Sequence, residues 1–407
     1  MRQIAAALPP DLPEHIGVAV SGGSDSLALL TLLHRFTQQR DIALSAVTVD
    51  HGLRPESAAE AVSVAQYAAQ LNIPHDTLNW TGWEGAGNTQ NEARKARYAL
   101  MSDWAQTRHI PAIALGHTLD DQAETVLMRL SRGAGVDGLS AMRGDVDREG
   151  VRWLRPLLGV RREALREILR ARAIHWQDDP SNDDNRYDRI KARQALALLA
   201  PLGVTTEALA QVAENMQAAR NALDARTREV ANRLVSVEAG ALKFQRASFE
   251  SLEPEIARRL VLAGLKWITG ADYAPRARSL AATLEALRRD ASATLEGCRL
   301  LQKGQNIWIF REFNAVKDLS CGPNALWDGR WALSGPEAGV PLTIAALGQE
   351  GLSACPDWRE TGLPRDLLLA VPAVWTSKTL HAAPHVGKGA GWVAKLQTDE
   401  TSLFRHP

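Results

Sequence analysis

The chain has 407 residues, more than one ordinary domain holds, so two or three domains are expected. Hydrophobic residues make up 45% of it and charged residues 23%, as is typical of a globular protein. Its 47 Lys and Arg residues balance 47 Asp and Glu residues, which excludes a global positive field, so any RNA binding must rest on local basic patches.

The first 130 residues alternate between strand and helix patterns. Strands are expected at residues 18–20, 43–49, 75–80 and 113–115, and helices at residues 27–33, 57–71, 91–107 and 120–130. Strands separated by helices of this length predict an α/β fold with a mostly parallel sheet covered on both faces. Ligands bind such sheets at the carboxyl ends of the strands. The informative residues gather at those ends, at residues 21–26, 50–54 and 116–124.

The first cluster, Ser21–Ser26, has the sequence SGGSDS and joins a strand to a helix. A helix N-terminus offers free N–H groups at the positive end of the helix dipole. Glycine lets an anion approach the backbone and serine adds donors, so the turn is expected to hold phosphates. The sequence is neither GxxxxGK[ST] nor GxGxxG. The alternative is an ordinary turn in which Ser24 or Asp25 caps the helix.

The second cluster, Gly116–Thr125, carries acidic residues at the start of a helix. Asp121 and Glu124 are three residues apart and share a face, while Asp120 can cap the helix. Two carboxylates on one face can hold an ammonium group or share a magnesium ion with triphosphate oxygens. The alternative is an acidic first turn that complements the helix dipole. His117 is a candidate proton shuttle or phosphate donor, or else a structural histidine.

Basic and glycine-rich segments follow. The glycines of Arg132–Leu139 either end a helix or let the backbone approach a phosphate. A helix near residues 161–172 and the start of the next near residues 186–193 are rich in arginine, on either side of a turn-rich loop at residues 176–182. A high density of arginines is usual on a solvated helix face, but such arginines can also bind RNA phosphates and a triphosphate tail.

The remaining residues predict further domains. Residues 205–290 have helical patterns with a short β segment near residues 241–249, and residues 294–313 become strand-like. The rest combines short strands, turns and tryptophans that by default belong to the core. Widely spaced Cys298, Cys321 and Cys355 argue against disulfides, zinc and a bound iron–sulfur cluster. With no leader-like segment and no apolar run of membrane length, we expect a cytoplasmic protein without a membrane partner.

Taken together, these motifs resemble the tRNA(Ile)-lysidine synthetases, a family of PP-loop ATP pyrophosphatases. The matching stretches are SGGSDS at residues 21–26, VDHGLRPES at 49–57, NEARKARY at 91–98, GHTLDDQAET at 116–125, RGAGVDGL at 132–139, RPLL at 155–158 and DDPSN at 178–182. Their order and spacing agree with the family across residues 1–195. The chain has Ile190 where the family tends to have an asparagine.

The resemblance implies a fold and an activity. The fold would be a Rossmann-like PP-loop domain at residues 1–195, a mainly helical tRNA-binding domain at 205–315 and a small α+β domain at 320–407. ATP, with Mg²⁺, would adenylate O2 of the wobble cytidine in an isoleucine tRNA with a CAU anticodon. The ε-amine of free L-lysine would then displace AMP at C2, giving lysidine, which reads AUA instead of AUG. No DNA partner is implied, and the oligomeric state stays open.

The resemblance and the chemistry of the residues together suggest roles for three groups. ATP would be bound by Ser21, Gly22, Gly23, Ser24, Asp25, Ser26, Asp50 and His51, with Asp25 holding Mg²⁺ on the phosphates. Catalysis would rest on Asp25, His117, Asp121, Glu124 and Arg97. The tRNA would be bound by Arg94, Arg132, Arg189, Lys191 and Arg193. Asp121 and Glu124 would either hold the ammonium group of lysine or position its amine, which must lose a proton before it attacks.

Three other functions are compatible with parts of the pattern. A PP-loop tRNA thiolase would need paired cysteines, and a PP-loop amidotransferase such as GMP synthetase would need a glutaminase domain with a nucleophilic cysteine; neither is present. An RNA-binding protein with an inactive ATP fold would be expected to lose acidic site residues. Asp25, Asp121 and Glu124 are all retained.

Overall fold

A computed structural model describes residues 2–52, 57–81, 89–148, 150–177, 188–271, 274–337 and 339–397. Residues 178–182 of the turn-rich loop expected at residues 176–182 lie outside the described residues, as does Arg186. The chain divides into two compact units, residues 1–220 and 221–407. The division into three domains drawn from the sequence stays a prediction.

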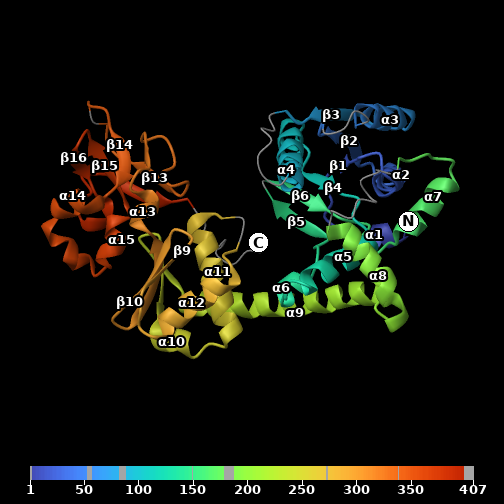
Figure 1. The fold of residues 1–407 in the computed structure, drawn as a ribbon. Helices are drawn as coiled ribbons and strands as arrows, with labels where there is room; N and C mark the ends of the chain where they lie inside the picture. Colours follow the sequence, from blue (N-terminus) through green and yellow to red (C-terminus); the bar gives the residue numbers. More distant parts are fainter. Residues whose placement is uncertain are drawn as a thin grey trace. The chain divides into compact units, whose positions relative to one another are not determined.

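The sheet of the first unit has six strands in the order β3-β2-β1-β4-β6-β5 (Figure 1). The strands are β1 (His15–Ala19), β2 (Ala43–Asp50), β3 (His75–Asn79), β4 (Ala112–Ala114), β5 (Asp145–Arg148) and β6 (Val151–Leu154). All neighbours pair in parallel except β5, which runs antiparallel to β6 at the edge. The predicted mostly parallel sheet is therefore confirmed, together with its first four strands.

Helices cover both faces of this sheet. The helices of the first unit are α1 (Arg2–Ala7), α2 (Ser24–Gln38), α3 (Ser57–Gln70), α4 (Thr89–Thr107), α5 (Leu119–Leu130), α6 (Val136–Leu139), α7 (Arg162–Arg170) and α8 (Asp188–Leu199), followed by a 3-10 turn (Ala200–Leu202) and the start of α9 (Thr206–Leu234). Leu30, Val64 and Leu165 bring α2, α3 and α7 into one apolar cluster. Met101 and Trp104 of α4 belong to a second cluster, with strand residues of the same sheet.

The strand order places a switch point between β1 and β4. The chain builds β2 and β3 on one side of β1, and β4 and β6 on the other. At such a point the connections after adjacent parallel strands leave in opposite directions, which opens a crevice at their carboxyl ends. Residues 21–26 follow β1 and residues 116–124 follow β4, so both motifs meet at this crevice.

The second unit combines helices with antiparallel sheets. Its first part holds the end of α9, β7 (Ser236–Glu238), β8 (Ala241–Gln245), α10 (Arg246–Glu250), α11 (Pro254–Thr269), α12 (Ala277–Arg288), β9 (Ala293–Leu295), β10 (Cys298–Lys303) and β11 (Asn306–Arg311). These strands form one sheet in the order β7-β8-β11-β10-β9, against which Val261 and Leu265 of α11 pack. The expected strand-like stretch at residues 294–313 is confirmed.

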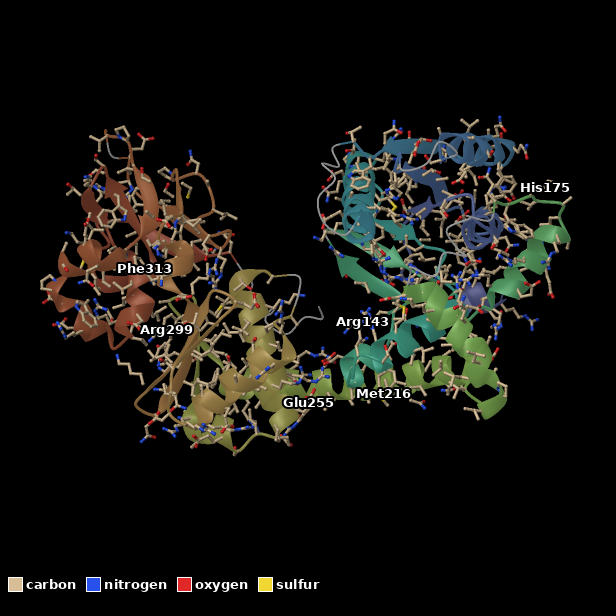
Figure 2. All side chains as sticks on the ribbon, viewed as in Figure 1. Arg143, His175, Met216, Glu255, Arg299 and Phe313 are labelled. Atoms are coloured by element: carbon tan, nitrogen blue, oxygen red, sulfur yellow. The ribbon has the colours of Figure 1, made fainter. Side chains whose placement is uncertain are left out.

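The last part of the chain is a small α+β arrangement. It holds α13 (Phe313–Val316), β12 (Ser320–Cys321), β13 (Trp331–Ser334), β14 (Thr343–Ala346), α14 (Gly348–Ser353), a 3-10 helix (Pro356–Thr361), α15 (Arg365–Leu369), β15 (Pro372–Thr376), β16 (Thr379–Ala382), a 3-10 turn (Pro384–Val386) and β17 (Val393–Leu396). Arg299 of β10, labelled in Figure 2, pairs with Asp366 of α15 at 2.9 Å. Trp327, Trp331 and Trp392 are buried, as the sequence predicts.

Within the described ranges, no single helix is both long and apolar enough to cross a membrane. The helix pair Asp188–Leu202 and Thr206–Leu234 is bent by 99°. It reaches the length and apolar composition of a membrane span only when its two helices are counted together.

Candidate active site

The SGGSDS turn ends as an uncapped helix N-terminus. Helix α2 has Gly23 as its N-cap residue, and no side chain in the described part of the chain caps it. Ser24 and Asp25 lie inside the first turn, so the alternative in which one of them caps the helix is wrong. Gly22 has a φ of +83°, a conformation that favours glycine. The first N–H groups of α2 are therefore left for a ligand, as a phosphate site requires.

The hydroxyl of Ser26 fixes the shape of this turn. It donates a hydrogen bond to the carbonyl oxygen of Gly23 at 3.0 Å and accepts one from the N–H of Ser21 at 3.1 Å. On the far side, the N–H of Gln177 donates to the carbonyl oxygen of Gly22 at 3.1 Å. The turn is thus formed before any nucleotide arrives, which lowers the entropy cost of binding.

The start of α5 is organised by Thr118, not by Asp120. Thr118 is the N-cap residue and forms a capping box with Asp121, whose Oδ2 accepts from the Thr118 N–H at 2.8 Å. The expectation that Asp120 caps this helix is therefore wrong. Asp120 lies one position inside the helix, and its Oδ2 accepts instead from the N–H of Arg162 at 2.7 Å, at the start of α7.

Gly116 brings the two motifs into contact. A Cβ atom at this position would lie 3.1 Å from the Ser26 nitrogen and 3.2 Å from the Asp25 carbonyl oxygen. Both atoms belong to the backbone of the first turn of α2, which has little freedom to shift. Glycine therefore allows the end of β4 to pack directly against the phosphate turn, and this contact sets the distance between Asp25 and the acidic residues of α5.

The guanidinium of Arg162 joins the three acidic residues that the sequence singles out. Its Nε donates to Asp25 Oδ2 at 2.8 Å and its Nη2 to Asp121 Oδ1 at 3.2 Å, while its Nη1 lies 3.6 Å from Glu124 Oε1. Only 2% of the Glu124 side chain and 8% of the Asp121 side chain are exposed, so these charges interact with little screening by water. Asp25, Asp121 and Glu124 thus form one cluster.

Two further arginines complete this cluster. Arg193 of α8 donates from Nε to Glu124 Oε1 at 2.6 Å, and Arg189 Nη1 lies 3.9 Å from Asp121 Oδ1. The sequence suggests tRNA contacts for both, but the structure places them beside the acidic pair. Glu124 Oε2 is buried and has no hydrogen-bond partner among the described residues. This oxygen is an acceptor that a substrate can still use.

The two carboxylates of α5 have pKa values displaced in opposite directions. Burial raises the pKa of Glu124 above its ordinary value, although Arg193 opposes the shift. Burial also acts to raise the pKa of Asp121, but Arg162 and the N–H of Thr118 outweigh it and leave that pKa below its ordinary value. Such a divergence is typical of pairs in which one group stays charged and the other exchanges a proton.

His117 is half-buried beside this cluster and has a neutral ring. Burial and then the positive charge of Arg155 lower the pKa of His117 to about 3. Its Nδ1 is buried without a hydrogen-bond partner in the described ranges. At neutral pH the ring is uncharged, so it can donate or accept a hydrogen bond but carries no positive charge toward a phosphate.

The other predicted residues lie around the crevice or farther out. Asp50 is the last residue of β2 and His51 follows it; His51 packs edge-on against Trp80 at 5.8 Å between ring centroids. Burial and then the charge of Arg97 lower the pKa of His51, which places Arg97 near that ring. On the exposed surface, Arg94 stacks on Tyr98, Arg132 pairs with Asp188 at 2.8 Å, and Lys191 lies on α8.

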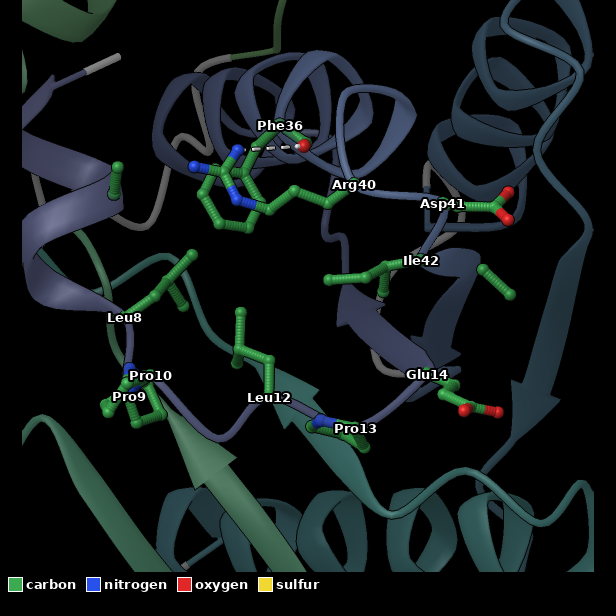
Figure 3. Close-up of a pocket in the computed structure, with 12 residues that line it drawn as sticks. Leu8, Pro9, Pro10, Leu12, Pro13, Glu14, Phe36, Arg40, Asp41 and Ile42 are labelled. Atoms are coloured by element: carbon green, nitrogen blue, oxygen red, sulfur yellow. Dashed lines mark hydrogen bonds between the residues drawn. The ribbon is translucent and has the colours of Figure 1, made fainter.

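The first unit also contains a separate pocket of about 1000 Å³ (Figure 3). It is lined by Leu8 and Leu12, by Phe36 and Arg40 near the end of α2, and by Glu14, which precedes β1. These residues mark the amino ends of the strands, whereas the acidic cluster lies at the carboxyl ends. The pocket is not part of the candidate active site.

Comparison with known proteins identifies the family of this chain. Residues 1–199 match the PP-loop domain family. A tRNA(Ile)-lysidine synthase of Ruegeria pomeroyi is 50% identical over 392 residues, which cover 96% of this chain and 93% of that protein. The chain belongs to the tRNA(Ile)-lysidine synthase family. The family member of Hyphomonas neptunium is 39% identical over 78% of this chain and 85% of that protein. Among solved structures, the U34-tRNA thiolase NcsA from Methanococcus maripaludis, with its [4Fe-4S] cluster, has a TM-score of 0.47 and 16% identity over 53% of this chain and 76% of that chain.

In this lysidine synthase family member, the sequence does not predict that Arg162 contacts all three carboxylates of the cluster. It is one of five arginines on a single helical segment, and its spacing does not separate it from the other four. Its contact with Asp25 joins residues 137 positions apart. The contact of Arg166 Nε with Ser24 Oγ, at 3.5 Å, spans a similar separation. Contacts between residues so far apart in the chain leave no local pattern in the sequence.

Proposed function

We propose that the chain ligates free L-lysine to C2 of the wobble cytidine in an isoleucine tRNA with a CAU anticodon, in the cytoplasm. ATP is converted to AMP and pyrophosphate, and the product, lysidine, reads AUA instead of AUG. The observation that carries the proposal is the meeting of an uncapped phosphate turn with the buried pair Asp121 and Glu124, joined by Arg162. One motif suits a triphosphate and the other suits an ammonium group.

In the first step, residues 21–26 hold the β- and γ-phosphates while O2 of the cytidine attacks the α-phosphate. Backbone N–H groups and hydroxyls of this turn stabilise the charge that develops on the departing pyrophosphate. Asp25 fits a magnesium ligand because it lies in the first turn of α2 beside this turn, and Mg²⁺ usually takes one or two carboxylates together with substrate phosphates. When bound, that ion neutralises phosphate charge. The described residues contain no group of three or more metal-ligating side chains that would hold it alone.

In the second step, Asp121 and Glu124 receive lysine. Asp121, whose pKa is lowered, stays ionised and holds the ammonium group. Glu124, whose pKa is raised, accepts a proton from it through the unpartnered Oε2. The freed amine attacks C2 of the adenylated cytidine and AMP leaves. Because an amine is almost fully protonated at neutral pH, a nearby proton acceptor is needed for this attack.

The remaining roles concern the nucleotide and the tRNA. Asp50 and His51 lie where the adenosine would extend from the triphosphate, and Arg97, close to His51, would contact the α-phosphate or the target nucleotide. Arg94, Arg132 and Lys191 would contact tRNA phosphates. Neutral His117 would donate or accept one hydrogen bond within the site. Residues 205–315 would bind the body of the tRNA, whose target base must leave its stack to reach the crevice.

Another PP-loop tRNA modification, thiolation, finds no support in the cysteines. All three are free, and Cys298 is buried, which raises the pKa of its thiol to about 12. A thiol with that pKa carries almost no thiolate at neutral pH.

The proposed function is tested by mass spectrometry of the RNA product. An isoleucine tRNA transcript with a CAU anticodon is incubated with the full chain, Mg²⁺, ATP and isotopically labelled L-lysine, and its nucleosides are then separated. We expect one labelled nucleoside, heavier than cytidine by one lysine joined with loss of water, only when ATP is present. A methionine tRNA transcript with the same anticodon is the control and should remain unlabelled. Labelling of neither transcript would contradict the proposal.

A further inference from the structure

The guanidinium of Arg162 fills the place that the proposed function gives to the ammonium group of lysine. Two of its nitrogens face Asp121 Oδ1, at 3.2 Å, and Glu124 Oε1, at 3.6 Å. The third donates to Asp25 Oδ2, at 2.8 Å, on the side of the phosphate turn. Guanidinium and ammonium groups are both cations that bind carboxylates. The two cannot occupy the same position between Asp121 and Glu124 at once.

We propose that Arg162 couples the ATP half of the site to the lysine half. Its guanidinium closes the lysine position while the phosphate turn is empty, and the triphosphate of ATP draws it away from Asp121 and Glu124 so that lysine can enter. The inference rests on the function proposed above. It gives Arg162 a role that differs from that of the other arginines of α7, because it makes lysine binding depend on the nucleotide.

The attachment of Arg162 allows this movement. Its backbone N–H is held by Asp120 at 2.7 Å, and one turn later Leu165 is completely buried in the core of the first unit. The backbone of α7 is therefore fixed, while the side chain, which is 19% exposed, extends from the first residue of the helix. Arg166 on the same helix already reaches Ser24 Oγ, at 3.5 Å, so a side chain from α7 is long enough to contact the phosphate turn.

The exchange conserves charge around the buried carboxylates. When Arg162 leaves, Arg193 remains 2.6 Å from Glu124 and Arg189 remains 3.9 Å from Asp121. The incoming ammonium group replaces one positive charge with another, which avoids the large cost of leaving a buried charge uncompensated. Without a nucleotide, lysine must displace Arg162 with nothing to receive the guanidinium. Lysine should therefore bind more tightly when a triphosphate occupies the turn.

Titration calorimetry with the full chain tests this coupling. L-lysine is titrated in the presence of Mg²⁺, with and without a non-hydrolysable ATP analogue. We expect wild-type protein to bind lysine about 10-fold more tightly with the analogue, within the range of ordinary coupling between sites. In Arg162→Ala the affinity without analogue should rise toward the affinity with it, so that the ratio of the two falls to about 1. If Arg162 had a purely structural role, Arg162→Ala would weaken lysine binding both with and without the analogue. The ratio of the two affinities would then stay near its wild-type value.

Two further variants and one reciprocal measurement accompany the test. Arg172→Ala is the matched control, because Arg172 is exposed and donates to the carbonyl oxygen of Ile168 at 3.0 Å; it should keep the wild-type ratio. Arg162→Met keeps an unbranched apolar stem like that of arginine without its charge, and serves if Arg162→Ala does not fold. In wild-type protein, lysine must tighten binding of the analogue by the same factor.

Several results would overturn the coupling. Equal lysine affinity with and without the analogue in wild-type protein would do so, as would a wild-type ratio in Arg162→Ala or in Arg162→Met. Absence of lysine binding in both states would also overturn it, because the exchange requires a lysine site that is open once the nucleotide is bound. If labelled lysidine still forms in any of these cases, the proposed function stands and only the coupling fails.

Discussion

An Asp25→Ala substitution is expected to lower lysine incorporation by at least about 100- to 1,000-fold, while binding of the tRNA persists. Asp25 lies in the first turn of α2, and its Oδ1 accepts a hydrogen bond from Ser24 Oγ of the phosphate turn at 3.2 Å. Its removal takes away the proposed magnesium ligand but leaves the backbone N–H groups and the Ser26 hydrogen bonds in place. The measurement is pyrophosphate release without lysine, together with a gel-shift titration of the tRNA.

Glu163→Ala is a suitable control for the loss of one negative charge. Glu163 lies on α7, next to Arg162 in the sequence, but it is exposed and pairs with Arg170 at 2.6 Å. Its removal should leave pyrophosphate release near the wild-type rate. Wild-type pyrophosphate release by Asp25→Ala would show that this carboxylate has no part in the first step.

Replacing Glu124 with alanine is expected to slow the lysine step by about 100- to 10,000-fold, the usual contribution of a general base. Adenylation should fall by less than about 10-fold, because the phosphate turn and Asp25 remain in place. Glu124 is the carboxylate of the α5 pair whose pKa is raised by burial, and its Oε2 has no partner in the described part of the chain. In wild-type protein the lysine step should also slow as the pH falls through this raised pKa, because the protonated carboxyl cannot accept a proton.

Glu124→Gln separates the chemical role from packing. The amide has the size of the carboxyl and can still accept from Arg193, but it cannot take the proton of the ammonium group. We therefore expect it to be nearly as slow in the lysine step as Glu124→Ala. Single-turnover assays started from ATP and tRNA, with lysine added later, resolve the two steps. Equal losses in both steps would show that Glu124 does not act specifically on lysine.

Much of the first unit could be predicted because its strands are short apolar runs that end at small or polar residues. Ile16 and Val18 on β1, and Ile113 on β4, are fully buried, as such runs require. The hairpin of β5 and β6 was missed because charged residues interrupt its pattern. Arg152 pairs across this hairpin with Asp145 at 2.7 Å, so a side-chain ion pair at the sheet edge replaces part of the apolar signal.

The candidate site could be predicted only where its geometry is local. The spacing of Asp121 and Glu124 on one helix places both carboxylates on one face, and the structure brings both to the same guanidinium. The contribution of Arg162 could not be inferred, because it depends on how α7 packs against α2 after the chain has crossed the sheet. The sequence offers Asp120 as an N-cap of α5 because aspartate is a common cap, but Thr118 competes for that position and forms the capping box.

A crystal structure of the full chain with a non-hydrolysable ATP analogue tests most directly whether the nucleotide lies at the switch point between β1 and β4. We expect the β- and γ-phosphates within about 2.7–3.2 Å of backbone N–H groups of residues 21–26. We also expect the α-phosphate on the side of Asp121 and Glu124. A triphosphate bound elsewhere, with residues 21–26 empty, would contradict this placement.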